Sequence, residues 1–263
     1  MQGINVQIKK SQKRVVFAEG EDPNILKAAV AFKNSKLGIP ILIGKEEIVK
    51  EQLKNSGLDS NFNIEISSSK DNQRREKYTN YLYKKFQRSG MLERECDHMV
   101  RNDRVTWGAC MVGCGDADAM VTGGTRHHAA TVEKLTKVVE ARPGEIIFGL
   151  TLMVSRGRTV FIADTNVHDN PTAEQLVQIA ISSTRVARLF GFDPKVAFLS
   201  HSTFGKPATE RTKHVREAIE LMKTKNVDFD YDGEMQPDVA LNTEYKGTYP
   251  FSKIVGNANV LIM

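Results

Sequence analysis

The sequence predicts an α/β fold made of two three-layer domains, each with a mainly parallel β-sheet. Short apolar, strand-like segments alternate with amphipathic, helix-like segments along all 263 residues. Glycine, proline and polar residues separate these segments, a pattern typical of parallel strands joined by covering helices. A chain of this length builds one large domain or two of ordinary size. We place a boundary near the turn at 141–144, which predicts domains at 1–141 and 142–263.

In the first half, the predicted strands are short apolar runs that end in turns. They span 14–18, 39–43, 63–66 and 120–121. The first helix is expected to begin at Pro23, because proline suits the first helical position and Asp22 can cap the helix. Further helices are predicted at 46–55 and at 71–88, where a strongly polar segment carries one apolar face. One or two more are predicted within 93–111.

The second half repeats this alternation. Strands are predicted at 146–154, 157–163, 196–200 and 260–263, with a tight reversal at 155–157. The best-defined helix spans 171–190, with Asn170 as its N-cap, Pro171 at its first position and Gly191 as a left-handed stop. A buried parallel strand normally continues into a crossover. The strand at 260–263 therefore predicts that the sequence is part of something longer.

Composition argues against several classes of protein. The net charge of +5 is mild, and basic residues are not interleaved with aromatic ones, which argues against a nucleic-acid partner. No apolar run approaches the roughly 18–20 residues that a membrane span needs. Residues 1–11 lack the apolar core of a secretory signal. Three cysteines (Cys96, Cys110 and Cys114) are too few and too scattered for a disulfide framework, so we expect buried free thiols and a cytoplasmic protein.

The segment 115–126 is the most informative motif. It reads as a buried strand followed by a glycine-rich turn that carries Thr122, Gly123, Gly124, Thr125 and Arg126. Ligands of open α/β sheets bind outside the carboxyl ends of strands. Hydroxyls, free amides and a guanidinium at such an end predict an anion cradle. The alternative is an ordinary strand-to-helix turn.

Three other segments follow predicted strands, at 164–170, 201–206 and 232–234. If the strands belong to two facing sheets, these loops and the 122–126 loop converge on one interdomain cleft. Ser202 and Thr203 suit phosphate contact, with a solvated turn as the alternative. Asp164 is either a general base or ligand-orienting carboxylate, or a cap for the loop backbone. His127 and His128 are adjacent, so one is expected to be exposed, and neither predicts a metal site.

Several motifs together resemble the phosphotransacetylase family. They lie at 118–124, 170–176 with 179–182, and 196–203. Others resemble the phosphotransacetylase-like C-terminal domain of bacterial NADP-dependent malic enzymes. These lie at 99–100 with 107–112, 157–165, 228–235 with 238–242, and 249–251 with 257–260. The similarity runs from about Arg14 to Met263, in order and with few gaps.

The resemblance implies two α/β domains related to the isocitrate-dehydrogenase-like fold, a cleft that binds the CoA part of acetyl-CoA, and a dimer. In the transferases, the CoA thiolate attacks acetyl phosphate. The family places a Ser-Arg pair and an Asp base in a C-terminal segment with no counterpart here, so those roles cannot be carried over. Glu133 stands where the transferases carry an arginine, and another family arginine falls near Lys84 or Lys85.

These observations predict a regulatory domain that binds acetyl-CoA or CoA without transferring an acetyl group. The chain itself needs no cofactor, because NADP and the divalent metal belong to a separate malic-enzyme domain, a possible partner. The alternatives are an active phosphate acetyltransferase, which would take acetyl phosphate, or an inactive gene remnant. We also expect a homodimer or larger oligomer that is poorly soluble as a monomer, because the strand at 260–263 has nothing after it.

Overall fold

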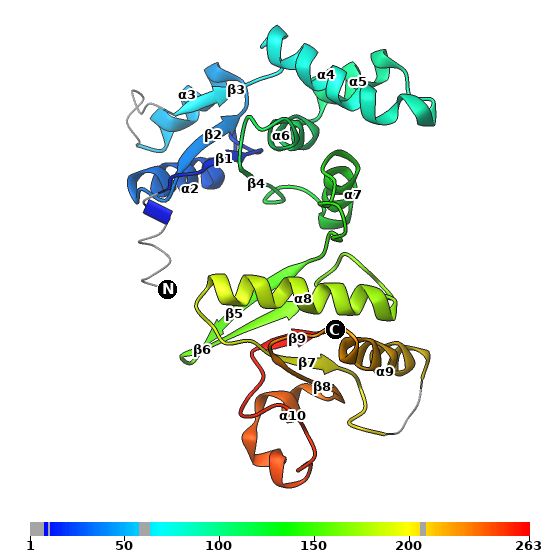
Figure 1. Cartoon of the computed structure of the whole chain (residues 1–263). Coiled ribbons are helices and arrows are strands. Elements are labelled where there is room, and N and C mark those ends of the chain that lie inside the picture. The colour runs from blue at the N-terminus through cyan, green and yellow to red at the C-terminus, as the bar shows by residue number, and fades with distance from the viewer. Residues whose placement is uncertain (1–7, 10, 58–63, 206–208) are drawn as a thin grey trace. The chain divides into compact units, whose positions relative to one another are not determined.

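The computed structural model describes residues 8–9, 11–57, 64–205 and 209–263. The predicted strand position Asn63 and loop position Lys206 lie outside these residues. The chain divides into two compact units, Met1–Glu140 and Ala141–Met263. Each unit contains one β-sheet with helices packed on it (Figure 1). The predicted α/β class with mainly parallel sheets is confirmed.

The sheet of unit 1 has the strand order β3-β2-β1-β4, and all of its pairings are parallel. Its strands are β1 (Arg14–Phe17), β2 (Ile39–Ile43), β3 (Glu65–Ser67) and β4 (Ala119–Val121). Its helices are α2 (Pro23–Asn34), α3 (Glu46–Asn55), α4 (Asn72–Phe86), α5 (Glu93–Asn102), α6 (Arg104–Gly113) and α7 (His128–Val138), with a short 3₁₀ turn η1 (Gln87–Ser89). The predicted helical segment 93–111 is two helices, because the backbone at Asp103 is extended.

Alternation along the strands produces the three layers of unit 1. Successive side chains of a strand point to opposite faces of the sheet. Val16 and Ile41 are buried against α4, α5 and α6, whereas Phe17 and Leu42 are buried against α2 and α3. Both faces of β1 and β2 are therefore covered, as expected for parallel strands, whereas the edge strand β4 is more exposed.

The core of unit 1 contains the only tryptophan of the sequence, Trp107. Its ring meets Tyr78 edge to face, with centroids 4.9 Å apart. The indole Nε1 donates to Ser67 Oγ at 2.9 Å, and the Tyr78 hydroxyl donates to Asp116 at 2.9 Å. Both rings are buried with their polar atoms satisfied, which locks α4 and α6 against the end of β3.

Unit 2 has the strand order β5-β6-β9-β7-β8, with one antiparallel pair, β5 with β6. Its strands are β5 (Leu150–Ser155), β6 (Arg158–Ala163), β7 (Lys195–Leu199), β8 (Asp230–Met235) and β9 (Val260–Ile262). Its helices are α8 (Ala173–Leu189), α9 (Glu210–Lys223) and α10 (Pro237–Leu241), with a 3₁₀ turn η2 (Thr243–Gly247).

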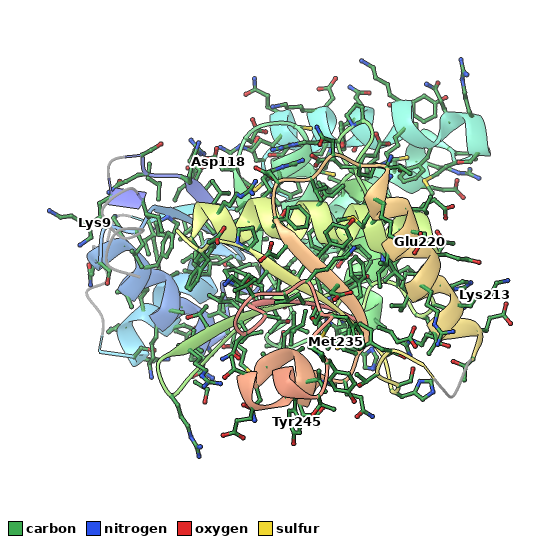
Figure 2. All side chains as sticks on the ribbon, turned by 60° about the horizontal axis from the view of Figure 1, so that its bottom comes forward. Lys9, Asp118, Lys213, Glu220, Met235 and Tyr245 are labelled. Atoms are coloured by element: carbon green, nitrogen blue, oxygen red, sulfur yellow. The ribbon has the colours of Figure 1, made fainter. Side chains whose placement is uncertain are left out.

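Unit 2 also has three layers. Phe198 and Ile262 face α8 and α9, whereas Ala197 and Leu261 pack with Met235 on the other face, near α10. Lys213 and Glu220 project from the outer side of α9 (Figure 2).

The predicted reversal at 155–157 is confirmed as a two-residue hairpin turn. Ser155 pairs with Arg158, and Arg156 and Gly157 between them have φ of 47° and 78°, as in a type I′ turn. The strand before it begins at Leu150 and not at 146, so that prediction was too long. The reason lies at Gly149, whose N–H donates to the Asp164 carboxylate at 2.6 Å.

The predicted N-cap of the long helix α8 was wrong. The helix begins at Ala173, and its cap is Thr172, which lies two residues after Asn170. Thr172 Oγ1 accepts from the Gln175 N–H at 3.3 Å, and the Gln175 side chain accepts from the Thr172 N–H at 2.8 Å. This reciprocal capping box satisfies two amides that a cap at Asn170 would leave open. The predicted stop at Gly191, with φ of 81°, is confirmed.

We predict that Thr172→Ala lowers the free energy of unfolding by ~1 kcal/mol, because the cap hydrogen bond is lost. Urea denaturation followed by circular dichroism measures the change. Asn170→Ala is the matched control, since Asn170 is exposed, and it should stay within ~0.5 kcal/mol. A larger loss from Asn170→Ala than from Thr172→Ala would contradict the assigned cap.

The three cysteines are free thiols, with Cys96 and Cys110 buried and Cys114 half-buried. Burial raises the pKa of the Cys110 thiol far above its usual range, so this group is a structural apolar side chain. Within the described residues, no helix combines the length and the hydropathy that crossing a bilayer requires.

Candidate functional site

The predicted site residues fall into two groups, one in each unit. Thr122–Arg126 follow β4 in unit 1, whereas Asp164, Ser202 and Thr203 follow β6 and β7 in unit 2. Each group lies at the carboxyl ends of the strands of its own sheet, where ligands of α/β folds bind.

Glu19 organises the glycine-rich loop of unit 1. It follows β1, the neighbour of β4, and is only 4% exposed. Its Oε1 accepts from the Gly123 N–H at 3.1 Å and from the Thr122 hydroxyl at 3.4 Å. The other oxygen, Oε2, has no hydrogen-bond partner among the described residues. A buried carboxylate oxygen without a partner is uncommon, and it leaves one acceptor open next to the loop.

Two glycines allow the loop its shape. Gly123 has φ of 96°, which a side chain rarely tolerates, and a Cβ on Gly124 would lie 3.0 Å from Ile25 Cδ1. After them, Thr125 is exposed and Arg126 keeps 38% of its side chain exposed. The loop thus presents one hydroxyl and one guanidinium outward.

Asp103 holds the Arg126 side chain in place. Its Oδ1 lies 3.6 Å from Arg126 Nη1, and its Oδ2 lies 3.0 Å from Lys134 Nζ. Burial alone would raise the pKa of Asp103, but the hydrogen bonds from Lys134 and Thr106 and the Arg126 charge lower it overall. Asp103 is therefore ionised near neutral pH, and Arg126 stays anchored yet reachable.

In unit 2, Asp164 caps its own loop. Oδ1 accepts from the Gly149 N–H at 2.6 Å, and Oδ2 accepts from the His168 N–H at 2.9 Å. The His168 Nδ1 lies 2.5 Å from the same Oδ2. Both carboxylate oxygens are occupied, so the geometry favours the backbone-capping interpretation over a free general base. It also orients the imidazole so that its other nitrogen, Nε2, points away from Asp164.

The Ser202 and Thr203 hydroxyls are engaged with β8. Ser202 is 3% exposed and donates to Glu234 Oε1 at 3.3 Å, and Thr203 Oγ1 accepts from the Gln236 N–H at 3.1 Å. The predicted loop at 232–234 is not a loop, because these residues lie within β8. Asp232 and Gly233 pair with Ala197 and Phe198 of β7, and the register then shifts so that Leu199 pairs with Met235.

Glu234 is the centre of a network that the sequence analysis missed. Its side chain is 1% exposed and forms a two-pronged ion pair with Arg216, with Nε to Oε2 and Nη2 to Oε1 both at 2.6 Å. Oε1 also accepts from the Gly205 N–H at 3.1 Å, and Arg216 donates to the Gly205 carbonyl. Glu234 thus fixes the whole turn after β7. The available signal was a carboxylate at every second position of the strand, at Asp230, Asp232 and Glu234.

The remaining positions that the sequence analysis singled out are exposed or pair with nearby residues of the chain. His127 and His128 are both exposed, one more than expected. Glu133 is exposed on α7 and pairs with Lys137 at 2.6 Å. Of the two lysines near the family arginine, Lys85 donates to the Val138 carbonyl at 3.0 Å and pairs with Glu140 at 3.1 Å.

A metal site is not formed by the described part of the chain. It contains no group of three or more His, Cys, Asp or Glu side chains that could hold a metal ion.

Comparisons with known proteins agree on one family. The family model described as phosphate acetyl/butaryl transferase matches residues 1–263. An NADP-dependent malic enzyme of Rhizobium meliloti is 41% identical over 264 residues, covering 100% of this chain and 35% of that protein. A phosphate acetyltransferase of Clostridium acetobutylicum is 32% identical, covering 97% of this chain and 78% of that enzyme.

Solved structures agree with this grouping. A phosphotransacetylase from Streptococcus pyogenes superposes with a TM-score of 0.87 at 29% identity, covering 99% of this chain and 80% of that chain. The present chain spans about a third of the length of the malic enzymes that it matches. Because the family model matches the whole sequence, the chain belongs to the phosphate acetyl/butaryl transferase family.

Proposed function

We propose that the chain is the C-terminal, phosphotransacetylase-like part of an NADP-dependent malic enzyme, where it binds acetyl-CoA or CoA in a regulatory role. The observation that carries this proposal is the pattern of similarity. Identity to a malic enzyme reaches 41% along the full chain, against 32% to a phosphate acetyltransferase. The chain therefore follows the malic-enzyme branch of the family.

The glycine-rich loop of unit 1 supports an anionic, nucleotide-like ligand. Arg126 is held by Asp103 but remains partly exposed. A guanidinium suits the phosphates of CoA, because its donors match phosphate oxygens in pairs. Ser202 and Thr203 in unit 2 are proposed as further ligand contacts, on the turn after β7 that Glu234 holds.

Glu133 is the reason to propose binding without acetyl transfer. In the transferases, the matching position carries an arginine that faces phosphate. Here the hydrogen bond from Lys137 lowers the pKa of Glu133, so the position is negative near neutral pH. A carboxylate repels acetyl phosphate, whereas CoA can still bind through other groups.

The proposed partners are inferred from the same similarity to malic enzymes. They are a second copy of the chain and a malic-enzyme portion, to which NADP and the divalent metal would belong. The second candidate function is an active phosphate acetyltransferase. The observation in its favour is that the chain covers 78% of the Clostridium acetobutylicum enzyme.

Isothermal titration of the purified chain with acetyl-CoA and CoA tests the proposed binding, and Arg126→Ala tests its site. We expect saturable binding that Arg126→Ala weakens by ~1–3 kcal/mol, because a charge-assisted hydrogen bond to phosphate is lost. Arg88→Ala is the control, since Arg88 is also exposed in unit 1 and lies on η1. No heat from folded protein at millimolar ligand would contradict the proposal.

A further inference from the structure

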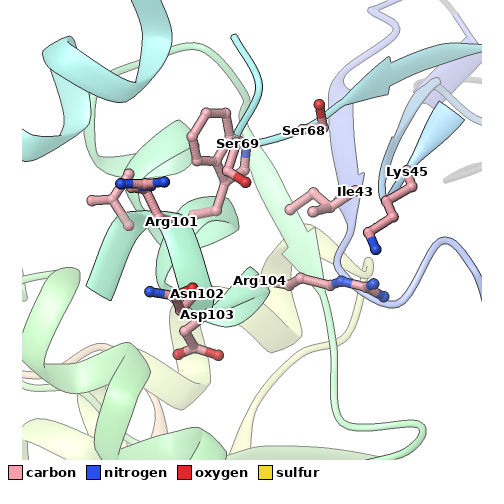
Figure 3. Close-up of a pocket in the computed structure, with 11 residues that line it drawn as sticks. Ile43, Lys45, Ser68, Ser69, Arg101, Asn102, Asp103 and Arg104 are labelled. Carbon is pink, nitrogen blue, oxygen red and sulfur yellow. The ribbon is translucent and has the colours of Figure 1, made fainter. Parts of the chain in front are cut away.

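Unit 1 holds a pocket of about 240 Å³ where β2 and β3 end (Figure 3). Its walls come from the turns after these strands and from the junction of α5 and α6. The residues that matter are Lys45, Ser68, Ser69, Arg101, Arg104 and Trp107. None of them was predicted as a site residue from the sequence.

The pocket is positively charged. Three cations, Lys45, Arg101 and Arg104, line it, against one carboxylate, Asp103. The Asp103 oxygens are already taken by Arg126 and Lys134, and the carboxylate points away from Lys45 and Arg104 (Figure 3). The acidic group therefore does not neutralise the pocket.

Lys45 and Arg104 extend toward each other from opposite walls (Figure 3). Glu21 lies between their elements, because its Oε2 is 2.5 Å from Arg104 Nη2 and its Oε1 accepts from the Lys45 backbone N–H at 2.7 Å. Burial tends to raise the pKa of Glu21, but these partners lower it overall, so it is ionised. One carboxylate thus faces two cations, and the Lys45 ammonium has no ion-pair partner among the described residues.

Arg101 adds charge on the facing wall. Its head group lies 3.7 Å from Asp97, which also pairs with Arg75 at 3.3 Å. The Arg101 side chain is 56% exposed, so it can turn toward a ligand.

Two helices also begin at this pocket, α3 after Lys45 and α6 after Asp103. Neither N-cap side chain accepts a hydrogen bond from a backbone amide of its helix. Open amides at a helix N-terminus favour an anion. This agrees with the charge of the side chains around them.

We propose that this pocket binds a phosphate monoester through Lys45, Arg101 and Arg104, with the Ser68 and Ser69 hydroxyls as further donors. Its volume equals roughly eight water molecules at ~30 Å³ each, and is below the ~300–1,000 Å³ of sites for drug-sized ligands. It therefore accommodates a phosphate group with a small organic body. The monoester is either that of a free metabolite or the 3′-phosphate of CoA.

Calorimetric titration of the chain with glycerol 3-phosphate tests this, with Trp107 fluorescence as a second readout from the pocket wall. We expect saturable binding at millimolar ligand or below, weakened about tenfold or more by Lys45→Met and by Arg101→Gln. Lys50→Met is the control, since Lys50 is exposed on α3, the helix that follows Lys45, and pairs with Glu46. No binding, or binding that Lys45→Met and Arg101→Gln leave unchanged, overturns the proposal.

Two further measurements, the binding of CoA and of dephospho-CoA, identify the source of the monoester. If the chain prefers CoA to dephospho-CoA and Lys45→Met abolishes the preference, the 3′-phosphate of CoA occupies the pocket. If Lys45→Met abolishes glycerol 3-phosphate binding and the two coenzymes bind equally, a free metabolite does. Arg126→Ala separates this inference from the proposed function, because it should weaken CoA binding but spare glycerol 3-phosphate. If Arg126→Ala loses glycerol 3-phosphate binding, the phosphate binds at the 122–126 loop, and the proposal that it binds in the pocket is wrong.

Discussion

The purified chain is expected to form acetyl-CoA from CoA and acetyl phosphate at less than ~0.1 s⁻¹. Ordinary enzymes turn over at about 10 s⁻¹, and loss of one preorganised stabilising group costs roughly 10²–10³ in rate. At position 133 the proposed change is larger than a loss, because an ionised carboxylate stands where the resemblance implies an arginine. Lys137 pairs with this carboxylate at 2.6 Å and holds it ionised.

A thioester absorbance assay measures this rate directly. The phosphate acetyltransferase of Clostridium acetobutylicum, 32% identical to this chain, is a suitable positive control under the same conditions. Turnover by the chain near ~10 s⁻¹ would establish the active transferase as the correct function.

The second large effect is expected from Glu234→Ala, which should lower the free energy of unfolding of unit 2 by ~3 kcal/mol. The change removes the ion pair with Arg216 and leaves the buried Ser202 hydroxyl and Gly205 N–H without their acceptor. Differential scanning calorimetry should show the unit 2 transition falling by ~10 °C, at ~2–4 °C per kcal/mol.

The matched control for this loss is Glu220→Ala on α9. Glu220 is exposed and pairs with Lys223 at 2.6 Å, so its removal should cost less than ~1 kcal/mol. Equal effects from Glu234→Ala and Glu220→Ala would show that the network around Glu234 does not stabilise the turn.

The same carboxylate predicts acid sensitivity. Burial alone would raise the pKa of Glu234, but hydrogen bonds from Arg216 and Gly205 lower it below the ordinary 4.5. Because the pKa of Glu234 is lower in the folded than in the unfolded state, its ionised form stabilises the fold above about pH 4.5. This stabilisation is lost as the pH falls through the pKa of Glu234 in the folded state. The difference in melting temperature between the wild type and Glu234→Gln should therefore be constant near neutral pH and shrink below pH 4.5. A constant difference into acid would contradict this linkage.

Local signals predicted the parts of the fold that depend on neighbouring residues. Asp22 does cap α2, accepting from the Asn24 and Ile25 amides, and Pro23 does occupy its first position. The Arg156–Gly157 reversal and the Gly191 stop are similarly set by backbone preferences of one or two residues. The prediction of Asn170 as the N-cap failed because the deciding residue is Gln175, which lies three residues after Thr172 and completes the capping box.

Long-range pairings account for what could not be predicted. Glu19 meets Gly123 across 104 positions, and Glu234 meets Arg216 across 18. Periodicity indicates where a strand ends, but not which carboxylate folds back to hold a neighbouring loop. Likewise, Ser202 and Thr203 read as free hydroxyls in the sequence, whereas the register of β7 against β8 engages both.

Equilibrium dialysis against acetyl-CoA labelled in its acetyl group, in phosphate buffer, tests the central claim most directly. A regulatory phosphotransacetylase-like domain should retain label saturably, and all of that label should be recovered as intact acetyl-CoA. Label appearing as acetyl phosphate, or folded protein that retains none, would contradict the account.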